Sequence, residues 1–232
     1  MGNLAIIPAR GGSKRIFRKN VKDFLGKPIM VYSIEAGLKS GLFEEVMVST
    51  DDKEIAEIAK KNGATVPFLR SEENSNDFAG LSDVCIEVIN NYKKIDREFD
   101  AVCCILPTAP FANSESLINA KKMIDEGMFD CVFPVVEYGY PIQRSLKIED
   151  RFVKMRWPEN ISKRSQDLEK TYHDAGQFYF IKTETLLTGK KLFTDKSGAI
   201  IQSDLEVQDI DTDMDWLIAE MKYKIINEGN KI

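Results

Sequence analysis

Short apolar runs alternate with amphipathic stretches over the first two-thirds of the chain. Runs rich in β-branched residues predict strands at residues 4–8, 46–50, 65–68, 101–106 and 131–136. Between them, apolar positions at helical spacing predict helices at residues 29–40, 52–62, 82–94 and 114–126. This alternation is typical of a parallel sheet with helices on both faces, so we predict a three-layer α/β/α fold with a mostly parallel, Rossmann-like sheet.

The alternation breaks between residues 137 and 172. A turn with Gly139 and Pro141 is followed there by short polar and charged segments. We interpret residues 137–172 as an arm inserted into one domain that spans residues 1–232, and as a contact between two copies of the chain. The α/β pattern then returns, with a strand at 177–181, a helix from Glu184, a strand near 199–201 and a terminal helix at 213–227.

Composition narrows the class of protein further. The chain has 232 residues, 43% of them hydrophobic, which is enough for one α/β domain with a full core. Its formal net charge of -5 argues against a nucleic-acid or membrane-surface protein. The four cysteines lack metal-ligand spacing and are expected to be reduced core residues, and no apolar run resembles a signal peptide or a membrane span, so we expect a cytoplasmic protein.

A basic, glycine-rich segment follows the first predicted strand, where α/β sheets bind ligands. It reads Ala9-Arg10-Gly11-Gly12-Ser13-Lys14-Arg15 and continues to Lys19-Asn20. Glycines allow the backbone N–H groups to approach a phosphate closely, and the cations supply charge for a triphosphate. The segment matches neither the phosphate loop GxxxxGK[ST] nor the dinucleotide motif GxGxxG, which leaves a different nucleotide site or a solvated basic loop.

A second candidate site lies near the C-terminus. Asp209 and Asp211 are separated by one residue in an extended run, so their side chains can converge on one hard cation. Magnesium prefers a few carboxylates combined with phosphate oxygens and water, which suits two aspartates beside a triphosphate. The alternative is that Asp211 or Asp213 caps the terminal helix. The single histidine, His173, lies in a polar patch, where a structural role is the usual one.

Residues 6–15, together with Lys19 and Asn20, resemble the opening motif of the acylneuraminate cytidylyltransferase family, the CMP-sialic acid synthetases. The resemblance continues in order along the whole chain, through residues 48–51, Arg70 with Asp77, residues 106–110 and residues 209–212. It implies a fold of the nucleotide-diphospho-sugar transferase type, with the arm as its dimerisation segment.

Within that family, residues 164–168 and 172–179 resemble the pseudaminic acid branch. Sialic acid enzymes usually carry an Arg-Pro-Asn-Gly-like sequence where this chain has residues 173–176. The chain also departs from the family pattern, with Phe17 at a common proline position and Leu106 at a frequent glutamine position. Gly80 and Leu81 replace small hydroxyl residues, which puts the base contacts there in question.

The resemblance implies that the chain transfers CMP from CTP to the anomeric hydroxyl of a nine-carbon acidic sugar, pseudaminic acid, and releases pyrophosphate for bacterial surface or flagellar glycan synthesis. It implies a homodimer that requires Mg²⁺. The catalytic residues would be Arg10, Lys19, Asp209 and Asp211, with Asp209 and Asp211 as metal ligands. The nucleotide would be bound by Ala9, Arg10, Gly11, Gly12, Ser13, Lys14, Lys19, Asn20, Arg70 and Asp77. The sugar would be bound by Arg164, Gln166, His173, Asp174 and Gln177.

Three alternatives stay open from the sequence. The sugar could be N-acetylneuraminic or legionaminic acid with the same chemistry. A metal-dependent glycosyltransferase also uses a nucleotide-binding α/β domain, but it consumes a sugar nucleotide and the basic loop favours a triphosphate. A non-catalytic nucleotide-binding regulator would keep the fold without turnover.

Overall fold

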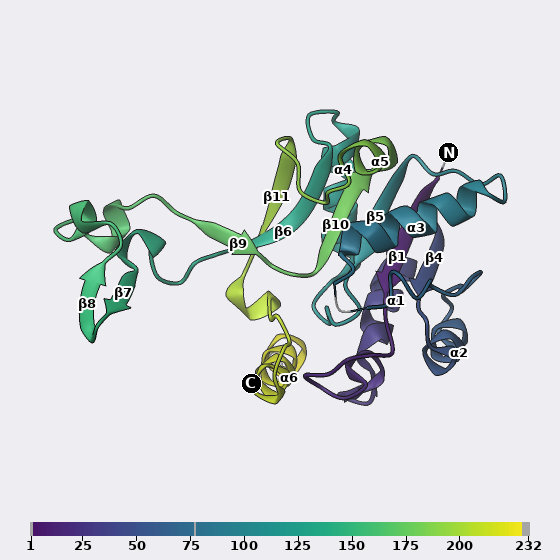
Figure 1. Ribbon diagram of the computed structural model, residues 1–232, viewed down its shortest axis with the longest axis horizontal. Coiled ribbons are helices and arrows are strands. Elements are labelled where there is room, and N and C mark those ends of the chain that lie inside the picture. The colour runs from purple at the N-terminus through teal and green to yellow at the C-terminus, as the bar shows by residue number, and fades with distance from the viewer. Residues whose placement is uncertain (1, 77, 229–232) are drawn as a thin grey trace.

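The computed structural model describes residues 2–76 and 78–228, and these residues form a seven-stranded sheet between two layers of helices (Figure 1). The strand order is β11-β6-β10-β5-β1-β4, and β9 pairs with β6. Only β9 and β10 run antiparallel to their neighbours in this sheet. The strands are β1 (Asn3–Pro8), β4 (Phe43–Ser49), β5 (Ala101–Ile105), β6 (Cys131–Glu137), β9 (Tyr172–Asp174), β10 (Phe178–Lys182) and β11 (Ser197–Gln202). The predicted mostly parallel sheet is confirmed.

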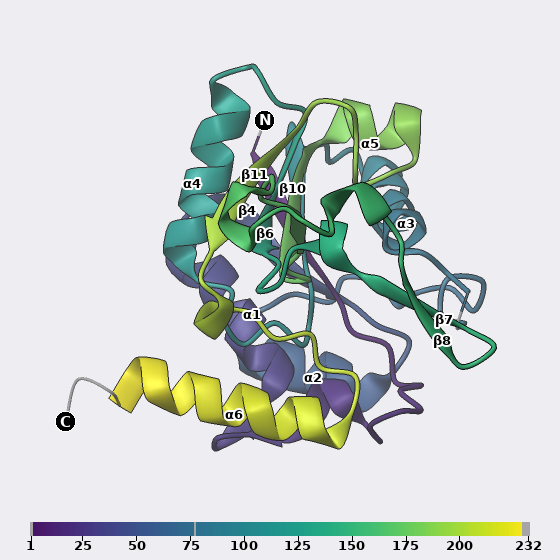
Figure 2. The same cartoon turned by 90° about the vertical axis from the view of Figure 1, so that its left-hand side faces the viewer.

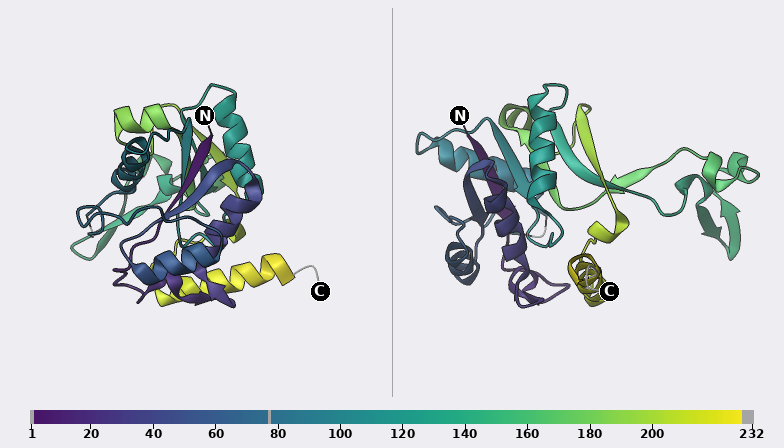
Figure 3. Two further views of the ribbon diagram at one scale, coloured as in Figure 1. Left: turned by 90° about the vertical axis from the view of Figure 1, so that its right-hand side faces the viewer. Right: turned by 180° about the vertical axis from the view of Figure 1, so that it is seen from behind.

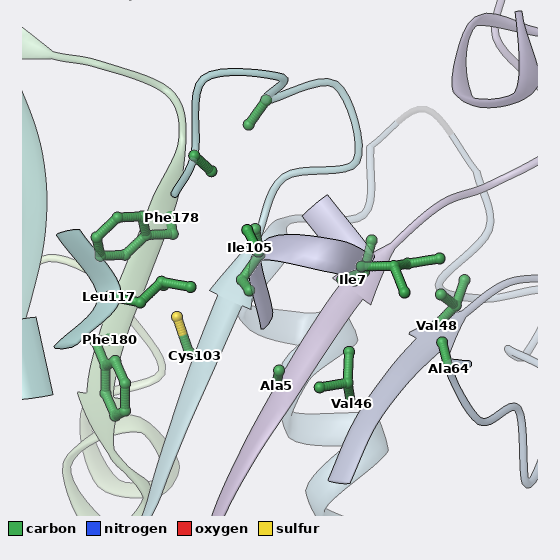
Figure 4. Packing of buried hydrophobic residues seen from close by; sticks show 14 of the residues in the cluster. Ala5, Ile7, Val46, Val48, Ala64, Cys103, Ile105, Leu117, Phe178 and Phe180 are labelled. Atoms are coloured by element: carbon green, nitrogen blue, oxygen red, sulfur yellow. The ribbon is translucent and has the colours of Figure 1, made fainter. Parts of the chain in front are cut away.

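Helices cover both faces of the sheet because its central strands are apolar on both sides. In β1, Ala5 and Ile7 belong to one buried cluster while Leu4 and Ile6 belong to another, as the alternation of a strand requires. Figure 2 shows α1 and α4 on one side and α3 and α5 on the other, and Figure 4 shows the first cluster. The helices are α1 (Ile29–Ser40), α2 (Lys53–Lys61), α3 (Leu81–Lys93), α4 (Ser114–Asp125) and α5 (Thr183–Gly189).

The terminal helix α6 (Asp213–Glu228) packs outside the sheet, against α1 and a small hairpin of β2 (Asp23–Phe24) and β3 (Lys27–Pro28). Aromatic rings fix it there: the centroids of Tyr223 and Tyr32 are 5.2 Å apart, and those of Trp216 and Phe24 are 5.6 Å apart. Edge-on ring pairs of this kind add to the burial of apolar area. Among the described residues, no helix combines the length and apolar character needed to cross a membrane.

The arm projects from the body of the molecule, as Figure 1 and the right-hand view of Figure 3 show. It carries the hairpin of β7 (Leu146–Glu149) and β8 (Phe152–Met155) and the short turns η2 (Ile142–Arg144), η3 (Pro158–Asn160) and η4 (Ser165–Asp167). One face of the hairpin is apolar, because Ile148 lies opposite Val153, and these side chains are 76% and 60% exposed. The arm therefore presents apolar surface that the rest of its own chain does not cover.

Two local expectations have different outcomes. The predicted strand at 65–68 is wrong, since the structure forms there only an isolated bridge between Thr65 and Met47. The cysteines behave as predicted: all four are buried and free, and none forms a disulfide. They are Cys85, Cys103, Cys104 and Cys131.

Candidate active site

The candidate site lies at the edge of the sheet where the parallel strands end. The basic loop at residues 9–18 follows β1, residues 50–52 follow β4, and the aspartate segment at residues 203–212 follows β11. The arm leaves the same edge after β6. Segments far apart in the sequence therefore meet at the carboxyl ends of the strands, the usual ligand-binding edge of an α/β sheet.

Side chains from outside the basic loop fix its backbone. The N–H of Gly11 donates to Oδ1 of Asp51 at 2.9 Å, and the amide nitrogen of Asn20 donates to the carbonyl oxygen of Arg10 at 2.8 Å. Asn20 is buried, so its amide serves the loop's shape in this structure. These two bonds fix the backbone at residues 10 and 11, and Gly12, Lys14 and Arg15 beyond them are exposed to solvent.

Asp52 is a further anchor of the loop, and the sequence reasoning missed it. Its carboxylate pairs with the guanidinium of Arg18 at 2.5 Å and accepts a hydrogen bond from the N–H of Ile55, which caps α2. The hydrogen bond from Arg18 lowers the pKa of Asp52. Arg18 itself has a positive φ of 52°, so the ion pair secures a backbone conformation that non-glycine residues seldom adopt.

Arg10 contacts residue 76, and Arg70 contacts the end of β4. A guanidinium nitrogen of Arg10 donates to the carbonyl oxygen of Asn76 at 2.7 Å. Arg70 is 8% exposed, and its Nε donates to Oγ of Ser49 at the end of β4 at 3.0 Å. Burial lowers the pKa of Arg70, and the nearby Asp51 acts in the opposite direction. The expected nucleotide residue Asp77 lies outside the described residues.

The structure brings the basic loop and the aspartate segment together. Arg15 pairs with Asp211 at 2.5 Å, and the ammonium of Lys19 lies 3.6 Å from the same carboxylate. The pKa of Asp209 is raised, first by partial desolvation of its carboxylate and second by the charge of Asp211. The residue as a whole is still exposed to solvent. Two carboxylates that repel each other therefore lie next to two cations at this point of the structure.

The alternative of a helix cap at Asp211 or Asp213 is wrong. Thr212 and Asp215 form the cap of α6: the N–H of Thr212 donates to Oδ2 of Asp215 at 2.7 Å, and the N–H of Asp215 donates to Oγ1 of Thr212 at 3.2 Å. Asp213 pairs instead with Lys22 at 3.0 Å. The cap leaves the carboxylate of Asp211 turned to the basic loop.

The donor set at this position fits a hard cation that also binds a substrate. Carboxylate oxygens are the ligands that Mg²⁺ prefers, and Asp209 and Asp211 carry carboxylates close enough for the charge of one to act on the other. Within residues 2–76 and 78–228, no three acidic, histidine or cysteine side chains gather in a group that could hold a metal ion. A cation held by the two aspartates would thus need further oxygen ligands, such as phosphate oxygens and water.

His173 and Asp174 lie on β9, at the base of the arm. The ring of His173 lies 4.8 Å from that of Tyr138. The carboxylate of Asp174 accepts hydrogen bonds from the N–H of Gly176, at 2.7 Å, and from the hydroxyl of Tyr179. Burial and this bond to Asp174 raise the pKa of Tyr179. Both candidate sugar residues are exposed, so they are accessible to a ligand.

The other three sugar-side candidates are placed differently. Arg164 and Gln166 lie on the arm, where Arg164 pairs with Asp167 at 2.8 Å, and the arm points away from the basic loop of the same chain (Figure 3). Gln177 is 2% exposed, and its amide nitrogen donates to the carbonyl oxygen of Glu206 at 2.6 Å. This position corrects the expectation that Gln177 contacts the sugar, because the 204–206 segment covers its side chain.

Comparison with known proteins identifies the family. A family model described as cytidylyltransferase matches residues 4–209. A pseudaminic acid cytidylyltransferase from Campylobacter jejuni serotype O:2 is 43% identical over 230 residues, which cover 99% of each chain. A CMP-N,N'-diacetyllegionaminic acid synthase from Legionella pneumophila is 32% identical over 97% of this chain and 98% of the relative. The chain belongs to the cytidylyltransferase family.

A solved structure supports the fold independently. A CMP:2-keto-3-deoxy-manno-octonic acid synthetase complexed with CTP superimposes with a TM-score of 0.69 over 98% of this chain and 100% of its own. The two sequences are 17% identical, so this likeness concerns the fold alone. The predicted fold class, the resemblance to acylneuraminate cytidylyltransferases and the assignment as a nucleotidyltransferase enzyme are confirmed.

Proposed function

We propose that this enzyme transfers CMP from CTP to pseudaminic acid and releases pyrophosphate. The observation that carries the proposal is the meeting of the basic loop with the aspartate pair, where Arg15 and Asp211 are 2.5 Å apart. The 43% identity to a pseudaminic acid cytidylyltransferase over the full chain supports this choice of sugar. The 32% identity to a legionaminic acid synthase makes legionaminic acid the second candidate.

The reaction needs positioning and neutralisation of charge more than proton transfer. The anomeric hydroxyl oxygen of the sugar attacks the α-phosphorus of CTP, and its proton passes to solvent. A new C–O–P linkage forms, the bond from the α-phosphorus to the bridging oxygen breaks, and pyrophosphate leaves with that electron pair. Arg10, Lys14 and Lys19 bind the triphosphate, and the backbone of residues 9–13 forms the cradle around it.

Asp209 and Asp211 would hold Mg²⁺ in the active complex. The ion would supply electrophilic stabilisation of charge on the phosphate oxygens. In this structure Arg15 and Lys19 lie against the carboxylate of Asp211, and both cations would also contribute charge to a triphosphate bound at the basic loop. The pKa of Asp209 is raised by desolvation and by the charge of Asp211. A divalent cation bound between the two carboxylates would reduce this repulsion.

Different residues are proposed for the nucleotide and for the sugar. Asn20 and Arg70, with Asp77, are proposed for the nucleotide, and Asn20 acts at least in part through the loop that it supports. His173 and Asp174 are proposed for the sugar. A carboxylated, N-acylated sugar needs a cation and several hydrogen-bonding groups, and Arg164 and Gln166 supply both kinds.

A homodimer would bring Arg164 and Gln166 to a site. The arm carries these residues away from the basic loop of its own chain (Figure 1), and its hairpin exposes an apolar face. Exposed apolar faces of this kind mark interaction surfaces. We therefore propose that the arm contacts a second copy of the chain, with its cation and amide directed to the second copy's sugar.

The cell interior is the proposed location. The four free, buried cysteines suit a reducing compartment, and CTP is an intracellular substrate. Activated sugar made there would serve the synthesis of bacterial surface or flagellar glycans.

The choice of sugar is tested by pyrophosphate release from CTP and Mg²⁺ in parallel reactions with pseudaminic, legionaminic, N-acetylneuraminic and ketodeoxyoctonic acids. We expect the highest kcat/KM for pseudaminic acid. A higher kcat/KM for another acid would make that acid the substrate and leave the proposed chemistry unchanged. If none of the four acids supports pyrophosphate release, the transferase assignment for these acids is rejected.

A further inference from the structure

The segment that carries Asp209 and Asp211 is held by side chains and not by a sheet. We call residues 204–212 of the aspartate segment the aspartate strap. It begins with the single turn η5 (Asp204–Glu206), and residues 207–211 belong to no helix or strand. The position of the two carboxylates must therefore be fixed by groups that reach the strap from elsewhere in the fold.

Lys222 of α6 holds the first half of the strap. Its ammonium donates to the carbonyl oxygens of Asp204, at 2.7 Å, and Val207, at 2.8 Å. The side chain of Lys222 is 16% exposed, so these bonds replace most of the hydration of a cation. A charged donor shared between two carbonyls three residues apart clamps the turn between them.

Gln177 also binds the backbone of this turn. Its amide nitrogen donates to the carbonyl oxygen of Glu206 at 2.6 Å, and the residue is buried at the start of β10. Its Oε1 is buried and has no hydrogen-bond partner among the described residues, a cost that the fold tolerates. Lys222 and Gln177 thus bind the carbonyls of residues 204, 206 and 207, directly ahead of the aspartate pair.

The bonds of Lys222 and Gln177 to the turn also influence the two carboxylates, because few residues separate the turn from Asp209 and Asp211. Asp209 is two residues beyond Val207, so only Gln208 separates the clamped carbonyl from the residue that carries the first carboxylate. Val207 is 6% exposed and packs with Val136 and Ala175, so a shift of its carbonyl would move a buried side chain together with Asp209. A displacement of the turn is therefore passed to the metal-binding oxygens and not absorbed in a flexible loop.

We propose that Lys222 and Gln177 are positioning residues that set the geometry of Asp209 and Asp211 for the cation. The inference rests on the proposed function, in which these aspartates bind Mg²⁺. Residues that support metal ligands generally control the affinity for the metal, and the proposal applies this rule to Lys222 and Gln177. It also gives Gln177 a role other than the sugar contact that its sequence position suggests.

The role of Lys222 can be separated from the stability of α6. The helix is anchored by ring contacts of Trp216 with Phe24 and of Tyr223 with Tyr32, none of which involves Lys222. Lys222→Met keeps the length and apolar stem of the side chain and removes its charge and donors. Lys222→Arg keeps the charge and the hydrogen-bond donors. Lys224→Met removes a lysine in the same way at an exposed site on the same helix.

Two readouts are needed, and one of them does not depend on turnover. The first is the Mg²⁺ concentration for half-maximal activity with saturating CTP and sugar. The second is the rise in Tm that Mg²⁺ produces in the presence of CTP. For Lys222→Met and Gln177→Met, we expect about a tenfold or larger increase in the half-activating Mg²⁺ concentration, and a Tm rise that needs correspondingly more Mg²⁺.

Lys222→Arg should recover most of the Mg²⁺ response, and Lys224→Met should match the unaltered protein. A loss of Tm without any change in the half-activating Mg²⁺ concentration would overturn the proposal and leave Lys222 a purely structural residue. If the unaltered protein turns over no acidic sugar, the proposed function fails, yet the Mg²⁺-dependent Tm rise with CTP still tests the strap. The absence of that rise in the unaltered protein would overturn the inference.

Discussion

The ammonium of Lys19 donates a hydrogen bond of 2.6 Å to the backbone carbonyl oxygen of Ile210, 191 residues further along the chain. Ile210 stands between the two candidate metal ligands and is itself buried. One cation, on the residue that follows the basic loop, therefore contacts the backbone of the aspartate strap and lies near the carboxylate of Asp211. The two halves of the site are joined at this point before any substrate binds.

Lys19→Met should damage both halves of the site. The substitution removes a cation proposed for the triphosphate and the donor to Ile210, and the remaining side chain still fills the same space. We expect a loss in kcat/KM of about a hundredfold or more, in line with the removal of one preorganised donor. Steady-state kinetics with CTP varied measures this loss. A variant with unchanged kinetics would exclude Lys19 from the catalytic residues.

Asp211→Ala should abolish turnover while the protein stays folded. The carboxylate faces Arg15 and Lys19 and not the core, and the cap of α6 is made by Thr212 and Asp215. Circular dichroism and Tm should therefore stay close to those of the unaltered protein. Asp213→Ala, which removes only a pair with Lys22, is the matched control and should keep activity. Mg²⁺-dependent turnover by Asp211→Ala would remove it from the metal site, and chelation of Mg²⁺ should stop the unaltered enzyme.

Gly11→Ala should disturb the loop, whereas Gly12→Ala should not. A Cβ atom on Gly11 would lie 2.8 Å from Oδ2 and 3.1 Å from Cβ of Asp52, and Gly12 has nothing within 4 Å of such an atom. Asp52 would have to move away from Arg18, so we expect a loss of about 1–3 kcal/mol in the free energy of unfolding and a higher KM for CTP. Chemical denaturation compares the two variants, and equal stabilities would contradict the close contact.

Asp52→Asn should destabilise the protein in a pH-dependent way. Arg18 lowers the pKa of Asp52 from its ordinary value of 3.8, so folding favours the ionised carboxylate. The stabilisation is present above that value and is lost as the pH falls through the lowered folded-state pKa. Asparagine keeps the helix cap, so the change isolates the charge. We expect a loss of about 1 kcal/mol at pH 7 that shrinks below about pH 4. Denaturation at a series of pH values tests this, and a constant difference would refute it.

A charge on the apolar face of the arm hairpin should separate the proposed dimer. Ile148→Glu places a carboxylate on the face that Ile148 shares with Val153, while Lys147→Glu changes the opposite face. Light scattering should give about twice the 26.3 kDa chain mass for the unaltered protein and for Lys147→Glu, and the single-chain mass for Ile148→Glu. A dimer that survives Ile148→Glu would locate the interface elsewhere.

Local sequence patterns predict the features that depend on neighbouring residues. The apolar run of β1 indicated a strand buried on both faces, and Asn62-Gly63 marked the end of α2, whose last residue is Lys61. The i, i+2 spacing of Asp209 and Asp211 predicts that their side chains converge, and in the structure the charges of Asp211, Lys19 and Arg15 all act on Asp209; their joint binding of a metal ion stays a prediction. The resemblance supplied the family, which composition alone did not.

Features that depend on distant segments were not predictable from local patterns. Asp52 meets Arg18 only because β1 and β4 are neighbours in the sheet. Gln177 looked available to a sugar because it stands in a polar patch, but the strap that covers it comes from residues 204–206. The run at 65–68 has the composition of a strand, yet only Thr65 forms a bridge, with Met47 of β4, and residues 67 and 68 form a bend. Tertiary contacts decide each of these cases.

The central claim is transfer of the CMP group at the α-phosphorus of CTP. The most direct test incubates the enzyme with Mg²⁺, pseudaminic acid and CTP labelled either at the α-phosphate or at the γ-phosphate. We predict that the α label appears in a sugar nucleotide and the γ label in pyrophosphate. A γ label in the sugar, or an α label released only as free CMP or CDP, would contradict the account.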